Sequence, residues 1–172
     1  MAEVFVNKVA ESGIITISLE DFLPGEDIIA FDMKEYLFMG LILKEKEFRE
    51  AIKQLDISPY QNRIVTLTCT TDAIVPVWAY MLVASILKPV VKEVLFGQIK
   101  DAELKILLAN IKAIDECQYT DQRIVIKGCG EKAIPEAAYV EITQKLRPIA
   151  KSIMYGEPCS TVPVFKKPMA KR

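Results

Sequence analysis

The amino-acid sequence predicts an α/β protein: a single-domain layered fold over residues 1–172, with a mixed, partly parallel sheet and an internal strand–loop–helix duplication. From residue 63 onward, β-branched runs alternate with segments whose apolar residues recur at helical spacing. Two stretches, 63–89 and 123–148, resemble each other. A chain of 172 residues also suits one domain that buries about 70% of its unfolded surface.

The two copies of the duplication are RIVTLTCTTDAIVPVWAYMLVASILKP and RIVIKGCGEKAIPEAAYVEITQKLRP. They share eleven identical residues when one gap is placed beside the first proline. Ordinary composition would give roughly one or two matches. Each copy has a β-branched strand, a cysteine, a short loop and a helix that opens near proline. This alignment places Cys69 and Cys129 at equivalent strand ends.

Before the repeats, short β-rich runs at 4–9 and 14–18 predict a hairpin or edge pair, and 28–31 predicts another strand. These N-terminal strands could extend one edge of the sheet in the antiparallel sense. Residues 45–55 predict an amphipathic helix, because their apolar side chains share one helical face. The apolar run at 36–43 fits helix or strand equally well.

Within and after the repeats, strands and helices are expected to alternate. Proline is tolerated in the first turn of a helix, so the first repeat's helix should begin near 74–76 and end by Lys88. The other expected elements are strands at 63–68, 90–96 and 123–127, a helix from Asp101 through Ile114, and a last helix over 135–154. Residues 156–163 hold too much proline for a central strand, and the basic tail 166–172 is expected to fray.

The composition excludes several classes of protein. The chain has no histidine, which rules out a Ser-His-Asp triad, a Cys-His dyad and an HExxH zinc site. Its 22 basic and 23 acidic residues create no field that attracts nucleic acid. The longest uncharged run, 73–87, is shorter than the roughly 20 residues of a membrane span, and the N-terminus lacks a signal-peptide pattern. We therefore expect a cytoplasmic protein with reduced cysteines, and neither nucleic acid nor a membrane as partner.

Cys69 and Cys129 are candidate functional thiols, because ligands of open α/β sheets bind where strands end and helices begin. Helix N-termini also favour the thiolate. The alternative is that each is a small apolar core residue, as free cysteines often are. Cys117 lies beside two acidic residues that disfavour a thiolate, and we interpret it as structural.

Cys159 extends this hypothesis to a set of three sulfurs. It lies in a loop of Gly, Pro, Ser and Thr, where burial in a core is less natural than function. Together with Cys69, Cys129 and a carboxylate from Asp72 or Glu157, it could hold zinc or an iron–sulfur cluster. No pair has the CxxC spacing that would make this pattern specific. Asp72 has a second interpretation, as the cap of the following helix.

The segments CTTDAIVPVWAYML, GLILKEKEFREAI and YGEPCSTVPVFKK resemble an uncharacterised bacterial family classed as a domain of unknown function, family 2480. The resemblance covers nearly the whole chain and carries no activity. Genes of this family often neighbour the SUF system for iron–sulfur assembly, so the resemblance implies SUF proteins as partners. The family's CTTDA and GEPCST motifs fall on Cys69, Asp72 and Cys159 here, without an assigned role.

Three hypotheses follow. The first is a cytoplasmic accessory protein that binds a metal, an iron–sulfur unit or persulfide sulfur through Cys69, Cys129 and Cys159. The second is a non-catalytic binding or scaffold module, a possible homodimer, with structural cysteines. The third is a thiol-dependent enzyme, which would need a lowered cysteine pKa without help from histidine. The sequence does not decide among them.

Overall fold

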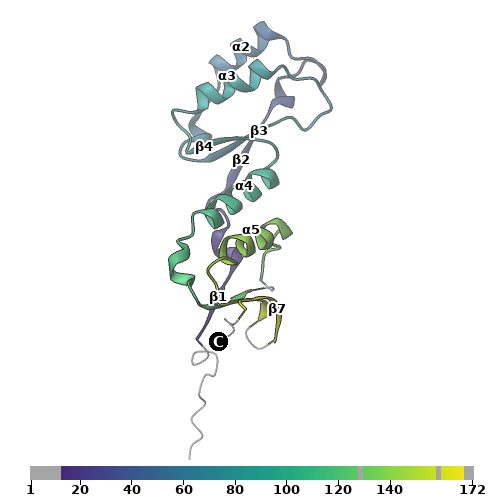
Figure 1. The fold of residues 1–172 in the computed structure, drawn as a ribbon. Helices are drawn as coiled ribbons and strands as arrows, with labels where there is room; N and C mark the ends of the chain where they lie inside the picture. Colours follow the sequence, from purple (N-terminus) through teal and green to yellow (C-terminus); the bar gives the residue numbers. More distant parts are fainter. Residues whose placement is uncertain (1–12, 128–129, 158–159, 169–172) are drawn as a thin grey trace, which may run out of the picture. The chain divides into compact units, whose positions relative to one another are not determined.

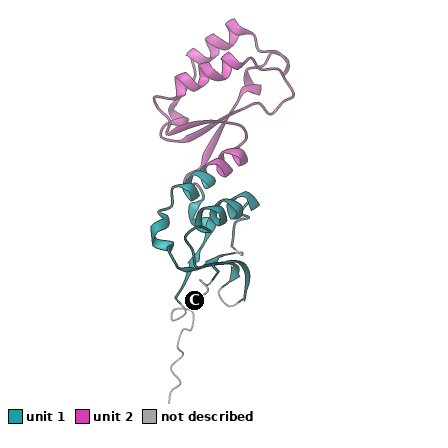
Figure 2. Cartoon of the chain, viewed as in Figure 1, with its two compact units in different colours: residues 1–23, 106–172 teal, residues 24–105 magenta. Residues whose placement is uncertain are grey.

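A computed structural model describes residues 13–127, 130–157 and 160–168. The chain forms two compact units, coloured separately in Figure 2. Unit 1 comprises residues 1–23 and 106–172, and unit 2 comprises residues 24–105. Helix α4 (Ile99–Lys112) runs across the boundary between them. Each unit has its own sheet and its own apolar core.

Unit 2 is built on three parallel strands in the order β2-β3-β4. Its elements are β2 (Ile28–Asp32), the 3₁₀ helix η2 (Met33–Tyr36), α2 (Glu45–Lys53), the 3₁₀ helix η3 (Ser58–Tyr60), β3 (Ile64–Thr68), α3 (Val77–Leu87) and β4 (Glu93–Phe96). The central strand β3 is buried along its whole length. A continuous β-branched run is typical of such a strand in a parallel sheet.

The core of unit 2 lies between this sheet and the pair α2 and α3, which run side by side in Figure 1. Val65 and Leu67 point from β3 into the core, since alternate residues of a strand share one face. They meet Phe48 and Ile52 of α2 and the α3 residues Ala79, Val83 and Leu87. The Phe31 ring of β2 stacks on Tyr36 at a centroid distance of 5.3 Å.

Unit 1 is built on a mixed sheet in the order β1-β5-β6-β7, in which the first three strands are parallel and β7 is antiparallel to β6. Its elements are β1 (Ile14–Ile17), the 3₁₀ helix η1 (Leu19–Phe22), the 3₁₀ helix η4 (Glu116–Tyr119), β5 (Arg123–Ile126), α5 (Glu136–Leu146), β6 (Ser152–Glu157) and β7 (Ser160–Lys166). Pro163 is accommodated because β7 forms an edge of the sheet.

One face of the unit 1 sheet packs against α5 and the second half of α4. Ile124 and Ile126 of β5 and Ile153 of β6 contribute the sheet side of this core. The helices contribute Leu107, Ile111, Ala138, Ile142 and Leu146, all fully buried. The i, i+4 spacing of the α5 residues explains why this helix presents one apolar stripe.

The structure confirms the α/β class and the mixed, partly parallel sheet. It also confirms the prolines as helix starts: Pro76 and Pro135 are the N-cap residues of α3 and α5. The strands are divided between two sheets, however, which the sequence pattern did not reveal. The N-terminal strands β1 and β2 are parallel to their neighbours, so the antiparallel arrangement considered for them is wrong.

The last predicted helix, 135–154, is wrong in its second half. Helix α5 ends at Leu146, because the residue before Pro148 is disfavoured from continuing a helix. Residues 152–157 form the strand β6 instead, with Ile153 buried in the core. At the C-terminus β7 continues to Lys166, and the backbone N–H of Lys167 donates to the Lys151 carbonyl at 2.9 Å. Residues 4–9 lie outside the described residues.

Candidate functional site

Cys69 lies directly after β3, at the carboxyl end of the strand where the sequence predicted it. Its side chain is half-buried and packs against the core of unit 2. The sulfur is 3.4 Å from the Thr71 hydroxyl and donates to the Thr71 carbonyl at 3.5 Å. These contacts within its own loop agree with the alternative in which this cysteine is part of the packing.

The other members of the predicted sulfur site are not brought to Cys69 by the described structure. Cys129 and Cys159 lie outside the described residues. Asp72 is exposed, and it does not cap α3, because the N-cap residue of that helix is Pro76. Among residues 13–127, 130–157 and 160–168, no three Cys, Asp or Glu side chains gather in a way that could hold a metal ion.

Cys117, which we interpreted as structural, lies exposed on η4. The adjacent acidic residues have the predicted effect. The hydrogen bond with the Asp115 carboxylate, and then its negative charge, raise the pKa of the Cys117 thiol. This sulfur is therefore poorly suited to bind a metal at neutral pH.

A carboxylate in unit 2 fixes the loop that carries Cys69. Asp32, at the carboxyl end of β2, accepts hydrogen bonds from the Thr70 backbone and hydroxyl and from the Lys34 backbone. Burial alone would raise the pKa of Asp32, but these hydrogen bonds outweigh it and hold the pKa below its usual value. The CTTDA motif is thus anchored through Thr70.

A cavity of about 1110 Å³ lies wholly within unit 1 and has the shape of a ligand site. Ligand pockets in proteins span roughly 300–1,000 Å³, so this cavity has room for a small organic molecule. It opens beyond the carboxyl ends of β1 and β5, beside the start of α5. Open α/β sheets bind ligands at this kind of position.

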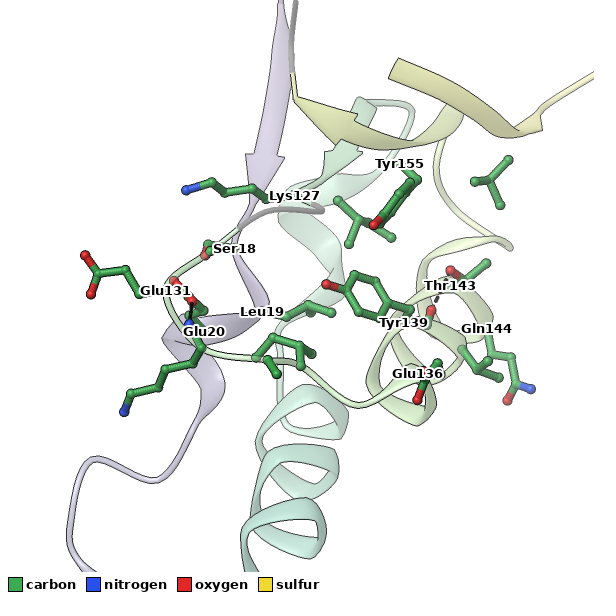
Figure 3. Close-up of a pocket in the computed structure, with 17 residues that line it drawn as sticks. Ser18, Leu19, Glu20, Lys127, Glu131, Glu136, Tyr139, Thr143, Gln144 and Tyr155 are labelled. Atoms are coloured by element: carbon green, nitrogen blue, oxygen red, sulfur yellow. Dashed lines mark hydrogen bonds between the residues drawn. The ribbon is translucent and has the colours of Figure 1, made fainter. Parts of the chain in front are cut away.

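The wall of the cavity is mostly apolar. One face of α5 forms one side, and residues that follow β1 and β5 form the floor, as the close-up in Figure 3 shows. The apolar lining side chains are Leu19, Ile126, Ala133, Ile134, Tyr139, Val140, Tyr155 and Val164. Val140 on α5 is 56% exposed, so few protein atoms surround its side chain.

Polar groups gather at the end of the cavity near η1. The Glu20 carboxylate accepts a hydrogen bond from the Lys132 backbone N–H at 2.6 Å, which ties η1 to the loop 130–134. Ser18, Lys127 and Glu131 lie around this contact in Figure 3. A Cβ atom on Gly130 would collide with the Glu20 carboxylate, so a larger residue here would displace that carboxylate from its present position.

Two tyrosines line the cavity and belong to different elements. The rings of Tyr139 on α5 and Tyr155 on β6 meet edge to face, with centroids 5.7 Å apart at 78°. Sequence reasoning did not nominate either tyrosine, and its last helix, 135–154, ended just before Tyr155. Unit 2 has a similar helix–strand pair, in which the rings of Tyr80 and Phe96 meet edge to face at 5.2 Å.

A family described as "Protein of unknown function (DUF2480)" matches residues 3–167. The chain belongs to this family. The match spans both units and confirms the family to which the CTTDA and GEPCST motifs pointed. No curated protein and no solved structure is similar to this chain at a significant level. Within the described part of the chain, no helix has the length and apolar character needed to cross a membrane.

Proposed function

We propose that this member of the family is a non-catalytic binding module whose unit 1 cavity takes a small, largely apolar organic molecule. The observation that carries the proposal is the cavity itself, about 1110 Å³ in volume and lined mainly by apolar side chains. Polar side chains line it in two places, around Glu20 and Lys132 and on α5 at Glu136, Thr143 and Gln144. An apolar wall with a few polar groups can bury an apolar body and orient a polar substituent.

The position of the cavity in the fold supports the same function. The strands β1 and β5 end at its floor, and α5 forms its wall, so rigid elements hold most of the lining residues. A site on a rigid scaffold loses little conformational entropy when a ligand binds. The loop 130–134 is the part of the wall that lies outside helices and strands, and the Glu20 hydrogen bond holds it.

Binding of 2-naphthol tests this proposal, because this neutral probe has an apolar two-ring body and one hydroxyl. We expect saturable binding with a dissociation constant of about 1 mM or tighter. Val140→Trp should weaken it at least tenfold, since the indole would fill the cavity beside α5. Val140 is exposed, so the variant should still fold.

Met81→Trp is the matched control. Met81 follows Tyr80 on α3 as Val140 follows Tyr139 on α5, and it is similarly exposed, at 66%. The control should bind 2-naphthol as the wild type does, because it leaves the unit 1 cavity unchanged. Equal loss of binding in both variants, or no loss in Val140→Trp, would contradict the proposal.

The thiol hypothesis remains a second proposal: an accessory protein of the cytoplasm that binds a metal, an iron–sulfur unit or persulfide through Cys69, Cys129 and Cys159, with SUF assembly proteins as partners. Its support is the position of Cys69 at the carboxyl end of β3, beside the anchored Thr70. Metal and sulfide analysis of protein purified without oxygen tests it. We expect loading that a triple Cys→Ser variant loses, and protein free of metal, cluster and persulfide would contradict it.

A further inference from the structure

Unit 2 carries a second apolar surface, which the cavity in unit 1 does not involve. We define it as the apolar face of unit 2, made of Phe38, Met39, Leu41, Ile42, Ile74, Val77, Met81 and Phe96. The exposed fraction of these residues runs from 47% at Phe38 to 91% at Ile74. A single exposed apolar residue is ordinary, but a group of this size needs a reason.

Backbone and ring contacts join these residues into one surface. Phe38 pairs with Ile42 in an antiparallel bridge, and Ile42 pairs with Ile74 in a parallel bridge. Val77 and Met81 follow on α3 at i, i+4 spacing, so they lie on one side of the helix. The Tyr80 ring links α3 to Phe96 at the end of β4, with the ring centroids 5.2 Å apart.

The size of the face corresponds to that of a protein–protein interface. At roughly 100 Å² of apolar surface for each of these side chains, the eight together expose on the order of 800 Å². The largest patch on a typical monomer is about 300–600 Å². A standard stable interface buries about 800 Å² on each partner. The face is therefore large enough to hold a dimer together.

Two lysines of the segment that carries part of the face are paired within the chain. Lys44 lies 3.4 Å from the Phe38 ring centroid and forms an ion pair with Glu47 at 3.1 Å. Lys34 is paired with Asp32 at 3.4 Å and with Glu35 at 3.9 Å. A lipid-binding face usually has a basic rim that attracts anionic headgroups, and the acidic partners of these two lysines offset their charge. The surface complementary to an uncharged apolar face is another uncharged apolar face.

We infer that the apolar face of unit 2 is the surface through which two copies of this chain associate. A second copy supplies a partner of the required size, apolar character and charge, and a two-fold axis brings the same residues of both copies together. This inference does not rest on the proposed ligand site, because all the residues that line the cavity belong to unit 1.

Sedimentation equilibrium of the full chain tests the inference. The wild type should sediment at twice the chain mass of 19.4 kDa, and Ile74→Glu/Met81→Glu should sediment at 19.4 kDa, since buried unpaired carboxylates oppose association. Met39→Ser/Leu41→Ser removes apolar area from another part of the face and should weaken the dimer at least tenfold. Circular dichroism reports whether each variant is folded.

Val140→Glu/Val164→Glu is the matched control, because it places two carboxylates at exposed apolar positions of unit 1. This control should remain dimeric. A monomeric wild type would overturn the inference, as would a dimer that survives both unit 2 variants. A wild-type monomer that sediments with phosphatidylglycerol vesicles would overturn it too, and would assign the face to lipid.

Discussion

The Asp32 carboxylate receives two hydrogen bonds from Thr70, one from the backbone N–H at 3.1 Å and one from the hydroxyl at 2.5 Å. Asp32 ends β2 and Thr70 follows β3, so the contact joins the carboxyl ends of two paired strands. Glu20 has a similar role in unit 1, where it follows β1 and holds Lys132 in the loop after β5. In each unit a carboxylate fixes the loop that leads to a helix.

Replacing Asp32 by alanine should lower the free energy of unfolding by about 1–2 kcal/mol at neutral pH, because Thr70 and Lys34 lose a charged acceptor. The pKa of Asp32 is lowered in the folded protein, so its contribution is complete above the unfolded pKa. It is lost as pH falls below about 4. Urea unfolding across this range measures the effect. Asp72→Ala is the control, and an unchanged difference between wild type and Asp32→Ala at low pH would contradict the assignment.

Substitution of Thr66 should raise the stability of the protein. Its side chain is fully buried in β3, and its hydroxyl has no hydrogen-bond partner among the described residues. Thr66→Val keeps the shape of the side chain and removes the unsatisfied oxygen. We therefore expect the free energy of unfolding to rise by about 1 kcal/mol. Denaturant unfolding measures this change. Destabilisation by the valine would show that the hydroxyl has a partner in solution, such as a buried water molecule.

The Glu20–Lys132 contact should control how tightly the cavity holds a probe. Glu20→Ala removes the hydrogen bond that ties down the loop 130–134, and Gly130→Ala displaces the same carboxylate. Both variants should bind 2-naphthol several-fold more weakly than the wild type while the unit 1 core remains intact. Glu26→Ala in unit 2 serves as the control. Unaltered affinity in both unit 1 variants would show that this loop does not shape the site.

Cys117 should label slowly although it is exposed, because Asp115 raises its pKa and leaves less thiolate at pH 7. A variant that retains only Cys117 allows the rate with iodoacetamide to be measured by mass spectrometry. The rate should rise with pH, and Asp115→Asn should increase it at neutral pH. Labelling at the same rate with and without the Asp115 carboxylate would contradict this explanation.

The class of fold was predictable because each strand and helix carries a local pattern. The β-branched runs of β3 and β5, and the prolines before α3 and α5, determine those elements with little help from tertiary contacts. The strand β6 was missed because its sequence continues an apolar helical pattern past Pro148, and only pairing with β5 and β7 makes it extended. Pairing between strands is not encoded in local periodicity.

Aligning the identical residues of the two repeats pairs side chains that lie on opposite faces of their strands. Matching RIV with RIV pairs Ile64 with Ile124, but Ile124 faces the core of unit 1, whereas Val65 and Leu67 face the core of unit 2. A one-residue shift exchanges the two faces of a strand. Val65 precedes Pro76 by as many residues as Ile124 precedes Pro135. An alignment of Val65 with Ile124 pairs Cys69 with Gly128 in the sequence. It removes the reason for treating Cys69 and Cys129 as equivalent.

The candidate site was harder to predict than the fold. The sequence indicated the carboxyl ends of the strands as its location, and the unit 1 cavity lies there. Sequence reasoning nominated cysteines, and the described residues do not test that choice, because Cys129 and Cys159 lie outside them. The cavity is formed by ordinary residues such as Val140, Tyr155 and Val164, which come from α5, β6 and β7. Their proximity follows from the β6–β7 pairing, which no short motif predicts.

The methyl carbon–proton NMR spectrum of the full chain during titration with 2-naphthol tests the central claim most directly. The cavity account predicts saturable shifts at Ile126, Ile134, Val140 and Val164, which line the cavity. Methyl groups in the core of unit 2, such as those of Ile52 and Val83, should not move. Shifts confined to the apolar face of unit 2, or no saturable shift at the cavity methyl groups, would contradict it.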